Sequence, residues 1–135
     1  MDYKTILTTC TYCGCGCNFF LEVLDGKLIG TIPCKTSPVN QGGLCIKGWN
    51  VHEFVTSKKR LTSPMIRKNG KLEKVSWEEA IDYTASNLKR IKDENSSDSL
   101  GFFASAKVTN EDNYILQKFA RAAVGTNNID HCARL

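Results

Sequence analysis

No stretch of this 135-residue sequence is long and apolar enough to cross a lipid bilayer. A secretory leader is missing too, because the short polar start Met1-Asp2-Tyr3-Lys4 leads almost directly to the first cysteine, Cys10. No twin-arginine export signal precedes the cysteines. The seven cysteines are an odd number, which argues against a closed set of disulfides. These absences predict a cytoplasmic protein without a membrane span, whose thiols are reduced.

A concentrated basic surface is also missing. The net charge is only +4, from 18 Lys+Arg against 14 Asp+Glu, and the densest cationic run is Lys58-Lys59-Arg60. Nucleic-acid binders usually gather basic residues with aromatic residues along one face. We therefore predict no nucleic-acid partner and interpret this run as a solvated linker. A hydrophobic content of 41% and a charged content of 24% are those of a globular protein.

Four of the cysteines form a pattern that needs a chemical reason. Cys10, Cys13 and Cys17 are spaced C-x2-C-x3-C, and Cys45 follows after a long gap. Each iron of a [4Fe–4S] cluster needs one protein ligand, so a tight loop can supply three and a distant segment the fourth. A structural zinc site with two C-x2-C pairs, a thioredoxin-like C-x-x-C and chance buried thiols are the weaker alternatives. The spacing predicts the cluster-binding module of an electron-transferring enzyme.

Lys47 lies two residues after Cys45, where a cation would adjoin the cluster and tune its potential. An ordinary surface lysine is the alternative. Gly42 and Gly43 before it and Gly48 after it indicate a close approach of the backbone to a bulky group.

Three cysteines remain outside the predicted ligand set. Cys15 alternates with the glycines of the loop and, like Cys34, is expected to be a packing residue. Cys132 is interpreted as a core thiol of the second half of the chain.

The first half of the sequence predicts an α+β iron–sulfur domain over residues 1–62. Asp25-Gly26 between two β-rich runs is a strong hairpin signal. The expected elements are a strand over residues 4–9, a hairpin of strands 19–24 and 27–32, and a helical stretch from Cys45 to Phe54. The character of the sequence changes around residues 57–64, where we place a domain boundary.

The second half, residues 63–135, predicts the truncated start of an α/β (αβα) domain. Ser76 with Glu79 forms a capping box for a helix to about residue 92, and a second helix ends at Gly125. The other expected elements are a hairpin about Asn69-Gly70, a short buried strand over 100–104, a capping pattern at residues 109–112 and a loop over 125–135. One such unit cannot cover both faces of a sheet, so apolar residues of the second helix (Ile115, Leu116 and Phe119) should lack a partner.

Several motifs together resemble the N-terminus of molybdopterin-dependent oxidoreductases. They are residues 10–17 (CTYCGCGC), 41–48 (QGGLCIKG), 61–67 (LTSPMIR), 75–80 (VSWEEA) and 125–130 (GTNNID). Within that family the likeness is closest to the catalytic subunits of formate dehydrogenases. The run His131-Cys132-Ala133-Arg134-Leu135 looks like the one before their metal ligand.

The resemblance implies that Cys10, Cys13, Cys17 and Cys45 bind the [4Fe–4S] cluster. It implies that Lys47 lies between cluster and pterin on the electron path, and that Lys107 lies in a loop near the pterin. The second cofactor would be bis-molybdopterin guanine dinucleotide with molybdenum or tungsten, completed by residues beyond this chain. The implied reaction converts formate to CO2 or the reverse. An iron–sulfur or flavin partner subunit would accept the electrons.

The family places its metal-ligating cysteine or selenocysteine just after the position of Leu135. The resemblance therefore implies that this chain ends where a selenocysteine codon stands and that it is inactive by itself. The alternative is that the sequence is partial for another reason. Two other interpretations stay open. A nitrate reductase of the same family would share the cluster motif and Lys47, and a ferredoxin-like carrier would leave residues 63–135 without a purpose.

Overall fold

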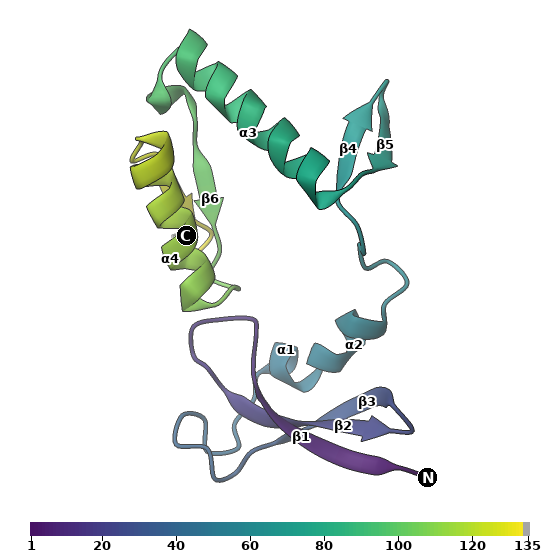
Figure 1. Cartoon of the computed structure of the whole chain (residues 1–135). Helices are drawn as coiled ribbons and strands as arrows, with labels where there is room; N and C mark the ends of the chain where they lie inside the picture. The colour runs from purple at the N-terminus through teal and green to yellow at the C-terminus, as the bar shows by residue number, and fades with distance from the viewer. Residues whose placement is uncertain (134–135) are drawn as a thin grey trace. The chain divides into compact units, whose positions relative to one another are not determined.

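The computed structural model describes residues 1–133, and its contacts divide the chain into two compact units (Figure 1). The first unit comprises Met1–Arg60 together with Ser105–Asn113, and the second comprises Leu61–Ala104 and Tyr114–Leu135. The first unit therefore includes a short segment from late in the sequence. We call Ser105–Asn113 the lysine segment, because it carries Lys107.

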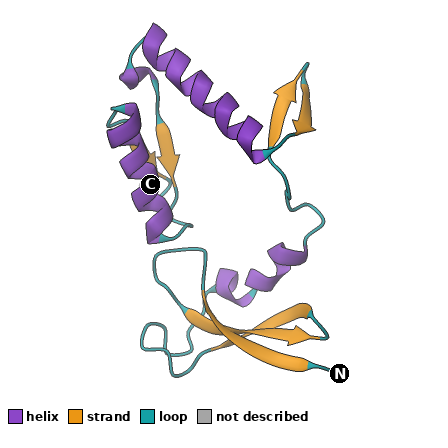
Figure 2. Cartoon of the chain, viewed as in Figure 1, coloured by secondary structure: helices purple, strands orange, loops and turns teal. Residues whose placement is uncertain are grey.

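The first unit contains an antiparallel sheet in the order β1-β2-β3 (Figure 2). Its strands are β1 (Tyr3–Thr9), β2 (Asn18–Leu24) and β3 (Lys27–Pro33). Asp25 and Gly26 both have positive φ, 47° and 77°, which is the backbone that a two-residue hairpin turn requires. The predicted strands and hairpin are confirmed, and the pairing Thr9 with Asn18 fixes the base of the loop between β1 and β2.

Two short helices, α1 (Ile46–Trp49) and α2 (Val51–Thr56), follow the loop after β3 and replace the predicted helical stretch. The hydroxyl of Thr31 on β3 donates a 2.6 Å hydrogen bond to the carbonyl of Trp49, which ties α1 to the sheet. The core of the unit is small. Phe19, only 1% exposed, packs with Cys10 and Val51. The first cysteine therefore belongs to the folded core.

The second unit begins with a hairpin of β4 (Met65–Lys68) and β5 (Lys71–Lys74) around Asn69-Gly70. Helix α3 (Trp77–Glu94) follows, and the Ser76 hydroxyl accepts a 3.1 Å hydrogen bond from the Glu79 N–H, as the capping box predicts. No residue of α3 is buried among the described residues. The helix runs two residues further than predicted, and a 3-10 turn, η1 (Ser97–Ser99), follows it.

The end of the described chain differs from the sequence prediction. Helix α4 (Asn110–Lys118) continues as a π-helical segment, η2 (Phe119–Val124), and ends at Gly125 with φ 87°, as expected. Residues 129–131 form strand β7 (Ile129–His131) rather than loop, parallel to β6 (Phe102–Ala104). The loop prediction was wrong because the adjacent polar residues Asn127 and Asn128 are typical of a loop. The strand depends instead on its pairing with β6, which lies far away in the sequence.

The buried character predicted for the strand over 100–104 is also only partly right. Leu100 is buried, but Phe103 is 87% exposed. The second helix does present apolar surface, since Ile115 is 62% and Phe119 40% exposed, whereas Leu116 is half-buried. Arg134 and Leu135, which complete the motif that begins at His131, lie outside the described residues.

Candidate metal centre

Residues 10–17, which we call the cysteine loop, join the paired ends of β1 and β2. The Cys10 N–H donates a 2.8 Å hydrogen bond to the Cys17 carbonyl, so the loop is closed at its base like a hairpin. Cys10 is buried, whereas Cys13 and Cys17 are half-buried. Gly16 has φ 67°, a backbone that favours glycine and turns the chain back before Cys17. The sheet thus presents three thiols within one short loop.

Cys45 reaches the same place from a separate segment. Residues 34–44, the connecting loop, lead from β3 to Cys45, which is the N-cap residue of α1. A cavity of about 40 Å³ in the first unit is lined by Cys10, Cys13, Cys17, Cys45, Lys47 and Lys107. We call it the cysteine cavity. All six residues singled out from the sequence therefore lie around one small space.

The thiols of the cavity influence one another's ionisation. Burial raises the pKa of Cys17, and the charges of the other three cysteines raise it further. The pKa of Cys45 is lowered, first by the backbone N–H groups of Gly48 and Lys47 and then by the Lys47 charge. A positive group bound in the cavity would relieve the repulsion among thiolates.

The donor set suits a soft, polynuclear iron–sulfur group. Four thiols and no carboxylate or imidazole line the cavity, and thiolates are the ligands of iron–sulfur clusters. The cavity exceeds the volume of about 10–15 Å³ that one water requires. Among the described residues, no three Cys, His, Asp or Glu side chains converge on a single ion position. A cubane does not require such convergence, because its four thiolates bind four different irons.

No spacing signal in the sequence links Lys107 to the cysteines. Lys107 is an exposed residue, and it lines the cavity through the fold of the lysine segment. Its N–H donates a 3.0 Å hydrogen bond to the Ser105 hydroxyl. The Asn110 amide donates a 3.4 Å hydrogen bond to the Gly14 carbonyl in the cysteine loop. Sequence reasoning missed this contact between residues 96 positions apart.

Glycines in and near the site lie close to other residues of the protein. A Cβ built on Gly14 would lie 2.9 Å from Cγ of Asn110, so the asparagine packs directly on that glycine. A Cβ on Gly42 would meet Lys35, one on Gly43 the Asn40 carbonyl, and one on Gly48 the Leu44 side chain. Gly48 also lines the cysteine cavity, whereas for Gly42 and Gly43 a close approach to a bulky group stays a prediction.

The remaining cysteines lie outside the cavity lining. Cys34 is buried with its sulfur 3.5 Å from the Thr36 hydroxyl, in keeping with a packing residue. Cys15 is exposed, so its prediction as a packing residue was wrong, and a hydrogen bond to Cys13 raises its pKa. Cys132 is exposed after β7, which corrects its interpretation as a core thiol. No disulfide joins any cysteines of the described residues.

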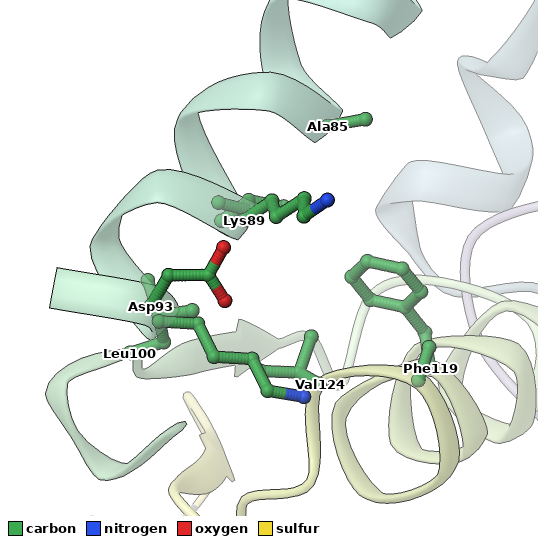
Figure 3. A pocket seen from close by; sticks show the side chains of 9 residues that line it. Ala85, Lys89, Asp93, Leu100, Phe119 and Val124 are labelled. Atoms are coloured by element: carbon green, nitrogen blue, oxygen red, sulfur yellow. The ribbon is translucent and has the colours of Figure 1, made fainter. Parts of the chain in front are cut away.

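A larger cavity of about 300 Å³ lies in the second unit between α3 and the segment Phe119–Val124 (Figure 3). Figure 3 shows Lys89 and Asp93 of α3 on one side and Phe119 on the other. Apart from such charged groups its lining is mainly aliphatic and aromatic, including Leu100 and Val124. The cavity offers apolar surface and no set of metal ligands.

Comparison with known proteins defines the family of this chain. The chain belongs to the molybdopterin oxidoreductase family, because the model of that family matches residues 60–135. The model of the molybdopterin oxidoreductase Fe4S4 domain matches residues 3–57, which include all four predicted cysteine ligands. The resemblance inferred from the motifs is confirmed, and so are the two cofactors of the family, a [4Fe–4S] cluster and molybdopterin.

Individual relatives are similar along the whole chain. The F420-dependent formate dehydrogenase subunit alpha of Methanocaldococcus jannaschii is 53% identical over 100% of this chain and 19% of its own length. The F420-dependent formate dehydrogenase 1 subunit alpha of Methanococcus maripaludis is 52% identical over the same shares. A putative formate dehydrogenase of Bacillus subtilis is 45% identical over 97% of this chain and 13% of its own. The chain thus spans about a fifth or less of these relatives. Within residues 1–133 no helix is long and apolar enough to pass through a membrane.

Proposed function

We propose that this chain is the N-terminal part of the catalytic subunit of a formate dehydrogenase, which interconverts formate and CO2. Three relatives named formate dehydrogenase, at 45–53% identity over nearly all of the chain, support formate rather than nitrate as the substrate. The family match over residues 60–135 argues against an isolated ferredoxin-like carrier, since those residues belong to a molybdopterin domain.

The observation that carries the proposal is the convergence of four thiols and two lysines on the cysteine cavity. They come from three segments far apart in sequence, namely the cysteine loop, the start of α1 and the lysine segment. Cys10, Cys13, Cys17 and Cys45 would each bind one iron of a [4Fe–4S] cluster. When bound, such a cluster supplies one-electron transfer, at a potential set by nearby charge and hydrogen bonds.

Lys47 and Lys107 supply positive charge to a site of four thiolates. Both lysines are exposed, so water and salt screen them and each tunes the potential modestly rather than forming a strong ion pair. A cation beside the cluster favours the state with the extra electron. We infer that Lys47, two residues after a ligand, lies on the electron path toward the pterin. We also infer that Lys107 adds positive charge to the cavity from the lysine segment.

The second unit would begin the α/β domain that holds bis-molybdopterin guanine dinucleotide. The parallel pairing of β6 with β7 supports this, because parallel strands belong to sheets covered by helices. The ligand of molybdenum or tungsten would come from residues outside this chain. An iron–sulfur or flavin subunit would take the electrons onward. F420 is the first acceptor to test, because the printed names of the relatives from Methanocaldococcus and Methanococcus include it.

The ligand set is tested by changing one cysteine at a time to serine and measuring iron per chain and the EPR signal of the reduced protein. We expect Cys10→Ser, Cys13→Ser, Cys17→Ser and Cys45→Ser to lose iron and the cluster signal. Cys15→Ser and Cys34→Ser are the matched controls and should retain both. A Cys15→Ser variant without cluster, beside a Cys17→Ser variant with it, would contradict the assignment.

The substrate is tested on the complete enzyme with both of its cofactors. We expect formate-dependent reduction of a dye, and of F420, and no nitrate-dependent oxidation of a reduced dye. Activity with nitrate and none with formate would overturn the formate assignment while leaving the cluster assignment intact.

A further inference from the structure

The position of the fourth cysteine depends on how the connecting loop is attached to the sheet. Cys10 and Cys17 are held by the ends of β1 and β2, whose pairing defines the cysteine loop. Cys45 instead follows eleven loop residues, 34–44, between β3 and α1. A loop of that length needs internal contacts to hold its end in one place. The structure supplies them through Ser37, whose hydroxyl donates to the Asn18 side chain, and above all through the side-chain amide of Asn40.

The amide of Asn40 makes three hydrogen bonds that join the two halves of the site. Its Oδ1 accepts from the N–H of Asn18, the residue after Cys17, at 2.9 Å. Its Nδ2 donates to the carbonyl of Asn18 at 3.1 Å and to the carbonyl of Gly43 at 2.9 Å. The Gly43 N–H donates back to the Asn40 carbonyl at 2.6 Å. Asn40 therefore contacts Asn18, the neighbour of Cys17, and Gly43, two residues before Cys45.

Asparagine is the side chain whose chemistry matches these three partners. It offers one acceptor and two donors, and here the acceptor meets an N–H while both donors meet carbonyls. Aspartate, which has the same shape, would place a carboxylate oxygen against the carbonyls of Asn18 and Gly43. Asn40 is half-buried, so water would replace these bonds only in part, although the Asn18 carbonyl would keep the Cys34 N–H at 3.4 Å.

We propose that Asn40 is a positioning residue of the cluster site, which fixes the distance between Cys45 and the cysteine loop. This inference rests on the proposed binding of a [4Fe–4S] cluster by the four cysteines. Asn40 does not line the cysteine cavity itself, so it acts on the cluster only through the backbone on either side of its ligands. It shapes the site as the outer contacts of metal ligands commonly do.

The test is the rate at which a chelator removes iron from the full protein prepared without oxygen, in wild type, Asn40→Ala and Asn40→Asp. We expect iron loss to be faster by about 10- to 100-fold in both variants, the usual cost of removing a contact that orients metal ligands. Asn40→Asp should be at least as fast as Asn40→Ala, because its carboxylate repels two carbonyls. The EPR line shape of the reduced cluster should also change, since one ligand has moved.

Two matched variants separate positioning from general stability. Ser37→Ala lies in the same loop and loses a hydroxyl that donates to the Asn18 side chain at 3.0 Å and accepts from the backbone N–H groups of Val39 and Asn40 at 3.2 and 3.5 Å. It leaves the three side-chain amide bonds of Asn40 in place. Asn87→Asp makes the same chemical change on α3, where the amide bonds only the Tyr83 carbonyl. Both should lose iron at close to the wild-type rate. If Asn40→Ala does not fold, Asn40→Gln carries the test, because its longer amide keeps every donor but shifts Gly43.

The outcomes are distinct. Wild-type kinetics in the Asn40 variants, or equal acceleration in Ser37→Ala, would overturn the inference and leave the cluster assignment standing. A wild-type protein that binds no cluster after anaerobic reconstitution would instead overturn the proposed function on which the inference rests.

Discussion

Replacing Gly14 by alanine tests whether the lysine segment is held on the cysteine loop by the contact of Asn110 with this glycine. The Gly14 backbone lies outside the left-handed region, so alanine fits its conformation and should stabilise by about 0.4–1 kcal/mol through the unfolded chain. The new Cβ, however, would lie 2.9 Å from Cγ and 3.0 Å from Nδ2 of Asn110. Asn110 must rotate away, which gives up an exposed 3.4 Å hydrogen bond worth about 0.5 kcal/mol. The two effects nearly cancel.

Gly101→Ala provides the matched control, because a Cβ there meets nothing closer than the Asn128 carbonyl at 3.9 Å. It should show the full stabilisation of about 0.4–1 kcal/mol, whereas Gly14→Ala should be near zero in urea unfolding followed by circular dichroism. In a double-mutant cycle, adding Asn110→Ala should restore the gain of Gly14→Ala. Equal stabilisation by both glycine variants, with an additive cycle, would refute the packing of Asn110 on Gly14.

Three further predictions concern charge, capping and thiol reactivity. In the complete enzyme, Lys47→Ala should keep its iron content but lose at least about tenfold in formate oxidation with an external acceptor, while Lys58→Ala should be unaffected; equal turnover would make Lys47 an ordinary surface residue. Ser76→Ala should lower the free energy of unfolding by about 1 kcal/mol in urea titration, because it removes the 3.1 Å cap of α3. In the metal-free protein, alkylation followed by mass spectrometry should label Cys45 at lower pH than Cys17. The thiolate is the reactive form, and the pKa of Cys45 is lowered whereas that of Cys17 is raised. The reverse order of labelling would contradict these shifts.

Local signals in the sequence predicted most of the elements. Asp25-Gly26 and Asn69-Gly70 specify turns with positive φ, and Ser76 with Glu79 specifies a helix start, so these features depend on a few adjacent residues. Strand β7 escaped prediction, because its three residues are defined by pairing with β6 and not by their own composition. The exposure of Cys15 escaped for the same reason, since burial depends on neighbours that are distant in sequence.

The sequence by itself determined the chemistry of the site. Three thiols in one loop and a fourth after a long gap indicate a cluster whatever the fold around them, because ligand number and spacing are properties of the chain. Only the tertiary structure decided which other groups share that site. Lys107 reaches the cysteine cavity because the lysine segment folds against Gly14, and Asn40 bridges the neighbours of Cys17 and Cys45. Contacts between residues far apart in the chain leave no spacing signal, so they exist only once the backbone has brought the segments together.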